Sequence, residues 1–219
     1  MMAKRIDTIQ LEGMLPRVFA EESIPSSDVW KVRASFLRGE TYLVEATSGA
    51  GKSSMCAYIY GSRCDYEGSL LFNGQDATTF SIDRWQQLRR TSLAYLPQEL
   101  SLFPELTALQ NIELKNSLTN HVELGQIEEW LHVLGIDSRK NHPVGRMSVG
   151  QQQRVGIIRA LCQPFDFIIL DEPVSHLDEA NNLRASEMIL TEARRQDAGI
   201  IATSVGNPLL IDHTRKLKL

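Results

Sequence analysis

Runs of apolar residues without polar alternation occur at three places and predict buried strands. Residues 165–170 are apolar except for Asp166, residues 41–44 precede a glycine-rich segment, and residues 199–203 lie near the C-terminus. Strands that lack alternation are typical of largely parallel sheets, which are buried on both faces. Because these strands alternate with helical segments, the pattern predicts an α/β fold.

Apolar residues in the middle of the chain recur at helical intervals, with charged residues between them. The pattern covers residues 82–88, 108–116 and 126–134 and predicts three helices. We expect this section to be all-helical, with outer limits near Ser81 and Val149. The sequence then predicts one α/β core, residues 1–80 and 150–219, with an inserted helical subdomain at about 81–149.

The composition narrows the class of protein. The 219 residues carry 23 Lys+Arg against 27 Asp+Glu, a formal charge of -4 without a block of like charges, which argues against nucleic acid as a partner. The longest stretch free of charged residues and histidine, 198–211, is shorter than the roughly 20 residues that a spanning helix needs. No apolar segment of a signal peptide follows the N-terminal basic residues, so we expect a cytoplasmic protein.

The three cysteines have an unusual count for a disulfide framework. Cys56, Cys64 and Cys162 are odd in number and show no CxxC spacing, which also argues against a zinc site. We expect all three to be reduced, small residues of the core.

A glycine-rich segment between the strand at 41–44 and a helix predicted over 54–60 has the chemistry of a phosphate-binding loop. Gly49 and Gly51 let backbone N–H groups converge on phosphate oxygens, Lys52 neutralises the β- and γ-phosphates, and the Ser53 hydroxyl is a Mg²⁺ ligand. Ala46 stands where the usual pattern begins with glycine, and at a positive φ it would cost about 1 to 2 kcal/mol. The alternative is a Gly/Ser-rich turn. The predicted ATP-binding residues are Thr47, Ser48, Gly49, Ala50, Gly51, Lys52, Ser53 and Ser54.

Two carboxylates follow the buried run at 165–170. Asp171 fits a water-mediated Mg²⁺ ligand, because buried charges need a partner and ligands bind at strand C-termini in open α/β sheets. Glu172, the next residue, points in a different direction from Asp171. It is suited to polarise the water that attacks the γ-phosphate. The alternative for Glu172 is a solvated loop carboxylate.

The segment 147–154 reads as the start of a helix. Ser148 and Gln151 form an S-x-x-Q capping box, which needs no ligand. A buried helix then leads directly into the acidic strand.

At this point the chain resembles the ATP-binding cassette (ABC) family, and the resemblance covers nearly all of it. Residues 147–154 are similar to the LSGGQ signature and the QQRV run that follows it. Residues 96–99 are similar to the Q-loop, 170–173 to the end of Walker B, and 175–178 to the D-loop. The resemblance implies an ATPase with a P-loop NTPase core, in which a mostly parallel sheet is joined by antiparallel N-terminal strands and an inserted helical subdomain. It implies ATP and Mg²⁺ as ligands.

The resemblance also assigns roles in the site. Gln98 is implied to reach Mg²⁺ and the attacking water, and Asp178 belongs to the loop at the dimer interface. Phe19 lies about where the family places an adenine-stacking aromatic residue, and a core phenylalanine is the alternative. The implied metal ligands are Ser53, Gln98 and Asp171.

Signature residues in this family act across a subunit boundary. The resemblance implies that Ser148, Gly150 and Gln151 contact the γ-phosphate bound by the opposite subunit, so that ATP joins a head-to-tail homodimer or heterodimer.

Residues 102–112 are similar to a segment of compact bacterial ATPases of the lipoprotein-releasing, macrolide-export and cell-division type. Those single cassettes dock on separate transmembrane permease subunits, which implies a place on the inner face of the cell membrane. Amphipathic packing on the core explains the segment equally well. A second class of function is an ATP-gated regulatory subunit that signals to a membrane complex without transport. Soluble cassettes of translation or DNA repair fit less well, because they carry two cassettes or long coiled coils.

Two further positions depart from the family pattern. Val149 replaces the first signature glycine, and Ser204 stands where the family supplies a histidine that holds the γ-phosphate and the catalytic water. We keep Ser204 as a catalytic position beside Glu172 and Gln98. Together with Ala46, these departures predict slow or partner-dependent hydrolysis. The alternative is drift at tolerated positions.

Overall fold

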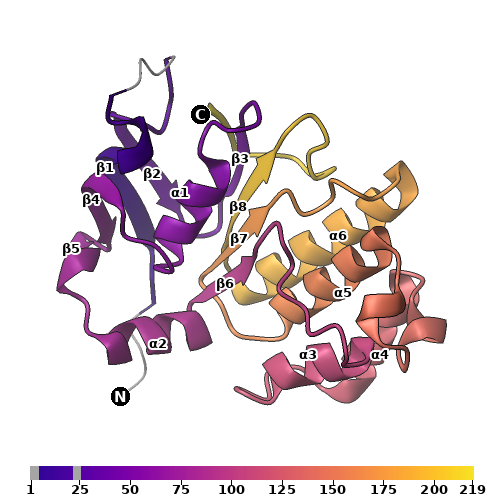
Figure 1. Ribbon diagram of the computed structural model, residues 1–219. Coiled ribbons are helices and arrows are strands. Elements are labelled where there is room, and N and C mark those ends of the chain that lie inside the picture. Colours follow the sequence, from indigo (N-terminus) through magenta and orange to yellow (C-terminus); the bar gives the residue numbers. More distant parts are fainter. Residues whose placement is uncertain (1–4, 22–25) are drawn as a thin grey trace.

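A five-stranded parallel sheet forms the centre of the computed structural model, which describes residues 5–21 and 26–219. Its strand order is β6-β7-β8-β3-β9, and every pair in it is parallel (Figure 1). The strands are β3 (Thr41–Glu45), β6 (Leu93–Leu96), β7 (Phe167–Asp171), β8 (Gly199–Ser204) and β9 (Arg215–Lys218). The three apolar runs of the sequence form its three inner strands, so the predicted α/β class is confirmed.

A second, antiparallel sheet has the order β2-β1-β4-β5 and confirms the antiparallel strands implied by the family resemblance. In β1, Ile9 and Leu11 are buried while Gln10 and Glu12 are partly exposed, the alternation of a strand with one face on a core. The strands are β1 (Thr8–Pro16), β2 (Arg33–Leu37), β4 (Tyr66–Phe72) and β5 (Gln75–Asp76).

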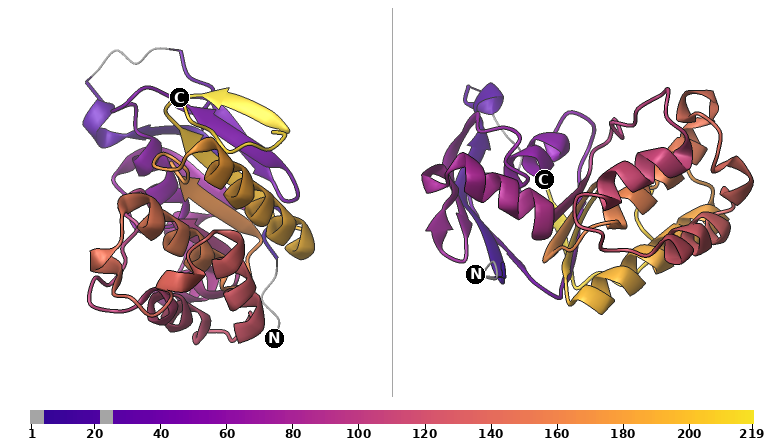
Figure 2. Two further views of the ribbon diagram at one scale, coloured as in Figure 1. Left: turned by 90° about the vertical axis from the view of Figure 1, so that its right-hand side faces the viewer. Right: turned by 90° about the horizontal axis from the view of Figure 1, so that it is seen from below.

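Helices cover both faces of the parallel sheet. The antiparallel sheet, α1 (Lys52–Ile59) and α2 (Ile82–Thr91) lie on one side of it, and the remaining helices lie on the other (Figures 1 and 2). Those helices are α3 (Ala108–Asn116), α4 (Leu124–Val133), α5 (Val149–Leu161) and α6 (Glu179–Gln196), and short 3-10 turns include η1 (Arg17–Phe19). No helix in residues 5–21 and 26–219 has both the length and the apolar character needed to span a membrane.

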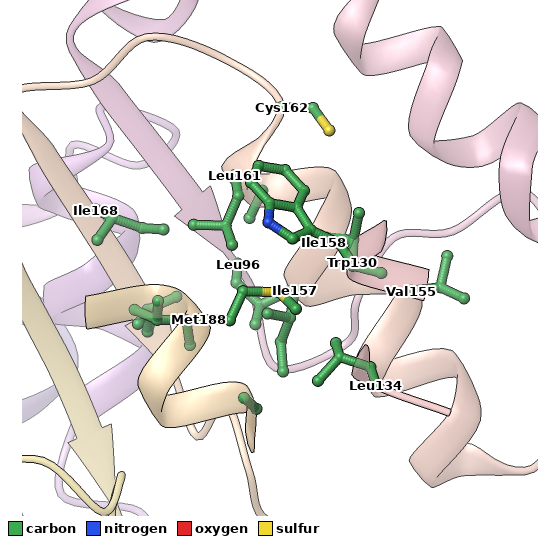
Figure 3. Close-up of a cluster of buried hydrophobic side chains, with 14 of the residues drawn as sticks. Leu96, Trp130, Leu134, Val155, Ile157, Ile158, Leu161, Cys162, Ile168 and Met188 are labelled. Carbon is green, nitrogen blue, oxygen red and sulfur yellow. The ribbon is translucent and has the colours of Figure 1, made fainter. Parts of the chain in front are cut away.

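The parallel sheet separates two hydrophobic cores. Alternate residues of β7 face opposite sides, so Ile169 packs with the antiparallel sheet and α1, while Ile168 packs with α3 to α6. In the second core, Trp130 of α4 and Ile158 of α5 lie among aliphatic side chains (Figure 3). The site described below lies at the carboxyl end of this sheet and draws residues from both sides of it.

Two sequence expectations are wrong in detail. The section from Ser81 to Val149 is not all-helical, because residues 93–96 form β6 and pair with β7. The segment α2–β6 therefore belongs with the sheet, and the purely helical part begins only after β6. Cys56 and Cys162 are buried as expected, but Cys64 is exposed.

Candidate nucleotide-binding site

The glycine-rich segment forms the loop between β3 and α1. Gly49 and Gly51 have φ values of 85° and 95°, and this left-handed region favours glycine. A Cβ on Gly51 would lie 3.0 Å from Phe19 Cε2 and 3.2 Å from Trp30 Cζ2. The Trp30 indole N–H also donates to the Ala50 carbonyl at 3.1 Å. Side chains from outside the loop therefore fix its shape.

Ala46 shows none of the strain that the sequence suggested. It is absent from the residues with positive φ, and its N–H donates to the Ser204 carbonyl at 3.3 Å, next to the paired strands β3 and β8. Alanine therefore fits this position.

The Lys52 ammonium connects the loop with the acidic strand end. Its side chain is only 5% exposed, and Nζ donates to the Thr47 carbonyl at 3.1 Å. Nζ also lies 3.6 Å from Glu172 Oε1. A buried charge requires such partners, and phosphate oxygens could serve the same ammonium.

Asp171 ends β7 and is almost completely buried, with 1% exposure. Thr203 on β8 lies opposite it, and the Thr203 hydroxyl donates to Asp171 Oδ1 at 2.7 Å. Asp171 Oδ2 is buried without any hydrogen-bond partner among the described residues. An unpaired buried carboxylate oxygen costs about 1–3 kcal/mol or more, so it marks a place where a ligand or water belongs.

Glu172 leaves the strand in an uncommon conformation. Its φ of 50° is left-handed, which costs a non-glycine residue about 1–2 kcal/mol. Its backbone N–H donates to Thr203 Oγ1 at 3.1 Å, and the bend brings its carboxylate to Lys52. Glu172 is thus a half-buried carboxylate beside the lysine, not a freely solvated loop residue.

Ser53 and Gln98 meet on the other side of the loop. The Ser53 hydroxyl donates to Gln98 Oε1 at 3.3 Å and so links α1 to the segment after β6. Hydroxyl, amide and carboxylate oxygens are a donor set that suits Mg²⁺, and the orphaned Asp171 Oδ2 adds an acceptor. Among the residues that the structure describes, no three His, Cys, Asp or Glu side chains group to hold a metal by themselves, so phosphate oxygens would have to complete the set. Ser54 accepts a hydrogen bond from Arg63 at 3.1 Å.

Ser204 ends β8 and is 2% exposed. Its hydroxyl is buried and has no hydrogen-bond partner within the described chain. His213 does not replace it: its ring lies 3.3 Å from the Leu209 carbonyl, and burial lowers the pKa of this imidazole.

A second polar surface is formed by the start of α5 and the loop before α6. The capping box is present, since Ser148 Oγ accepts from the Gln151 N–H at 3.3 Å and Gln151 Oε1 accepts from the Ser148 N–H at 3.0 Å. Val149 is 53% exposed. Gly150 lies close to the loop, because a Cβ there would be 2.9 Å from the His176 carbonyl oxygen.

Asp178 caps α6. Its Oδ1 accepts from the Asn181 N–H at 2.8 Å, and this backbone hydrogen bond lowers the pKa of the carboxyl. In the described residues no hydrogen bond or ion pair joins Ser148, Gly150, Gln151 or Asp178 to the P-loop. The predicted residues therefore separate into two groups, one around Lys52 and one at the start of α5 and α6.

Three residues of this region were not predicted from the sequence. Thr203 forms hydrogen bonds with both Asp171 and Glu172. Its position as a polar residue at the end of an apolar run is the sequence signal that could have identified it. Gln153 is a buried polar residue on α5 that bonds to the Glu172 carbonyl at 3.0 Å. Trp30 has no local signal, since it is distant from the loop in sequence.

The parallel sheet, the left-handed glycines of the β3–α1 loop and the lysine beside strand-end carboxylates define a P-loop nucleotide-binding protein. A family model described as ABC transporter matches residues 30–175. The chain belongs to this family, as one of its ATP-binding ATPase subunits.

Characterised relatives agree with that assignment. The chain is 31% identical over 193 residues to the lipoprotein-releasing system ATP-binding protein LolD of Novosphingobium aromaticivorans, covering 86% of each chain. It is 31% identical over 161 residues to the ABC transporter ATP-binding protein YtrE of Bacillus subtilis, covering 72% of this chain and 70% of YtrE. It is 33% identical to the macrolide export ATP-binding/permease protein MacB of a Shewanella species, covering 67% of this chain but 23% of MacB.

Solved structures share the fold. The dimeric structure of MJ0796, a bacterial ABC transporter cassette, superposes with a TM-score of 0.73 at 24% identity, covering 89% of this chain and 87% of that one. A post-hydrolysis state of MJ0796 bound to ADP and Pi gives 0.74 at 22% identity, covering 91% and 88%.

Proposed function

We propose that this ATPase subunit closes head to tail with a second cassette around Mg-ATP and drives a separate membrane subunit. The observation that carries the proposal is the convergence of Lys52, Glu172 and the orphaned oxygen of Asp171 at the carboxyl end of one sheet. A cation, a general base and a free acceptor are what hydrolysis of a phosphoanhydride needs.

Lys52 and Glu172 carry the reaction. Phosphate oxygens of ATP replace Thr47 O and Glu172 as acceptors of the Lys52 ammonium, which neutralises charge on the β- and γ-phosphates. Glu172, released from the ion pair, accepts a proton from the attacking water. Ser53, Gln98 and, through water, Asp171 would hold Mg²⁺, which supplies further charge neutralisation when bound.

The second polar surface supports closure with another cassette. The Ser148 oxygen accepts from Gln151, so its hydroxyl proton remains free to donate to phosphate. The N-terminus of α5 adds the positive end of a 13-residue helix dipole. Within residues 5–21 and 26–219 no hydrogen bond or ion pair joins this surface to its own P-loop, so it suits the ATP of a second subunit. The MJ0796 cassette, solved as a dimer, has the same fold.

Hydrolysis is slow in this proposal because of Ser204. Its hydroxyl is short, uncharged and unpaired inside the protein. Val149 adds a branched side chain to the surface that meets the second subunit. Ala46 no longer supports slow hydrolysis, since its backbone is unstrained.

The test combines turnover and assembly. Phosphate release should be slow in the wild-type protein, absent in Glu172→Gln and about 10-fold faster in Ser204→His, as expected for one added hydrogen bond to the transition state. Size-exclusion chromatography with light scattering should show Glu172→Gln as a dimer in Mg-ATP and a monomer without it. Rapid turnover that Ser204→His leaves unchanged would contradict slow hydrolysis. A monomer at saturating Mg-ATP would contradict closure.

Ser204, in place of the histidine that the family resemblance implies, also favours a second candidate. This candidate is a regulatory subunit that signals through ATP-gated closure. Glu172→Gln with ATP can be used to pull down its membrane partner from detergent extracts. A permease with a large periplasmic domain indicates export or lipoprotein extraction, as the names of MacB and LolD suggest for this chain. A regulator of envelope hydrolases indicates signalling.

A further inference from the structure

His176 is an exposed histidine on the second polar surface, in the loop between β7 and α6. Its backbone N–H donates to Gln153 Oε1 at 3.0 Å. Its carbonyl oxygen would lie 2.9 Å from a Cβ on Gly150, so the loop packs directly on the start of α5. His176 therefore lies next to the residues at the start of α5 that contact the other subunit's ATP in the proposed dimer.

A chain of hydrogen bonds leads from Glu172 to the ring of His176. Gln153 Nε2 donates to the Glu172 carbonyl at 3.0 Å and to Ser175 Oγ at 3.3 Å, while Gln153 Oε1 accepts from the His176 backbone N–H. Ser175 Oγ lies 3.0 Å from His176 Nδ1, and either atom can be the donor of this hydrogen bond. In the tautomer that accepts at Nδ1, a neutral imidazole carries its proton on Nε2 and can donate it to a ligand.

The nucleotide site has a serine at the end of β8, where the family resemblance implies a histidine. Lys52 is the cation beside Glu172, and Ser204 offers a short buried hydroxyl. Two other histidines make their contacts elsewhere: His121 lies 3.7 Å from Glu192, and His132 lies 3.7 Å from Asp137.

We propose that His176 of one subunit donates a hydrogen bond from Nε2 to the γ-phosphate of the ATP held by the other subunit. It supplies in trans a donor that Ser204 is too short to give. This inference rests on the proposed head-to-tail dimer. It assigns His176 a direct contact with the substrate, and Ser175 and Gln153 position its ring.

The first test is a double-mutant cycle of steady-state ATPase activity. His176→Ala should lower kcat about 100- to 1,000-fold, the range for removing one donor from developing charge, with a smaller change in KM. In the Ser204→His background the same change should have little effect, because the site then has its own imidazole. His132→Ala, whose side chain is 79% exposed on α4, is the matched control and should leave kcat unchanged.

The second test asks whether His176 acts across the subunit boundary. Lys52→Ala and His176→Ala should each be inactive or weakly active alone. In a mixed dimer, the intact Lys52 of the His176→Ala subunit faces the intact His176 of the Lys52→Ala subunit. Mixing the two variants should therefore recover activity that neither shows alone. Failure to recover activity overturns the assignment in trans.

A third measurement does not depend on turnover. In the Glu172→Gln background, His176→Ala should raise the dissociation constant of the ATP-bound dimer about 10-fold, as for one lost charge-assisted hydrogen bond. Unchanged dimer affinity together with unchanged kcat overturns the inference while leaving the proposed function intact. Equal losses of kcat with and without Ser204→His show a structural role and also overturn it. A different result overturns the proposed function: the wild type has no ATPase activity and Glu172→Gln forms no dimer in ATP.

Discussion

Thr203 is the residue that holds both strand-end carboxylate residues in place. Its hydroxyl donates to Asp171 Oδ1 and accepts from the Glu172 N–H, inside a region with almost no solvent access. One hydroxyl therefore sets the position of the proposed metal ligand and the backbone bend of the proposed base.

Thr203→Val should destabilise the protein because it leaves both partners of this hydroxyl unpaired. Each unsatisfied buried group costs about 1–3 kcal/mol, so we expect a loss of roughly 2–4 kcal/mol in the free energy of unfolding, measured by urea denaturation. Thr203→Ser keeps the hydroxyl and serves as the control. Equal urea midpoints for Thr203→Val and the wild type would show that these hydrogen bonds carry no net stability.

The sequence predicted the acidic residues of the site better than their conformation. Asp171 and Glu172 follow an apolar run, and this is a local signal. The left-handed φ of Glu172 and the hydrogen bonds of Thr203 to Asp171 and Glu172 depend on the pairing of β7 with β8. These strands are separated by α6 in the sequence, so a local pattern does not reveal their pairing.

At the scale of elements, Glu192 ties α6 to the segment between α3 and α4. Burial opposes its ionisation, but the nearby His121 and the hydrogen bonds from Arg195 and Gln196 outweigh burial and lower the pKa of the Glu192 carboxyl from 4.5 to about 2. Arg195 Nη2 lies 2.7 Å from Oε1, and His121 Nε2 lies 3.7 Å from it. The ionised carboxylate is thus preferred in the folded state.

This preference predicts a pH-dependent contribution to stability. A carboxyl whose pKa is lower in the folded than in the unfolded state adds stability above the unfolded value, and that stability is lost as the pH falls from about 4.5 toward 2. Glu192→Gln should therefore cost about 2–3 kcal/mol at pH 7, and its difference from the wild type should shrink as the pH is lowered through this range. Urea unfolding at pH 7 and pH 3 measures it. Glu187→Gln, exposed on the same helix, is the control, and a deficit independent of pH would contradict the prediction.

Element prediction succeeded where periodicity was long and local. The helix predicted over 108–116 is α3, whose capping box at Thr107 and Gln110 fixes its start. Strand β6 was missed because its four residues are too few to show a hydrophobic periodicity. They form a strand because they pair with β7. In β1 the alternation is visible in the sequence, but its partners β2 and β4 are separated from it by loops and α1.

At the scale of the whole molecule, the nucleotide site is held by residues from both sides of the parallel sheet. Trp30 belongs to the core under the antiparallel sheet and bonds to the P-loop. Gln153 lies on α5, in the helical half, and bonds to the loop that follows Glu172. Movement between the two halves would therefore alter both ends of the site, which is the mechanical property that an ATP-driven subunit requires.

Binding of Mg-ATP should accordingly stabilise the whole chain and not one loop. At a ligand concentration of about 100 times Kd, the folded state gains roughly 2.7 kcal/mol, which for a chain of this size raises Tm by about 5–11 °C. Differential scanning fluorimetry of Glu172→Gln, which cannot consume the ligand, measures this shift.

Three further samples decide whether the shift comes from the site described. Lys52→Ala removes the ammonium that meets the phosphates and should abolish most of the shift, while chelation of Mg²⁺ should reduce it by leaving Asp171 and the phosphates facing each other without a cation. Lys140→Ala, which loses a surface ion pair to Glu128, should retain the shift. An equal rise in Tm for Lys52→Ala would place the nucleotide elsewhere, since no phosphate bound by the β3–α1 loop can be indifferent to the only ammonium beside it in the described structure.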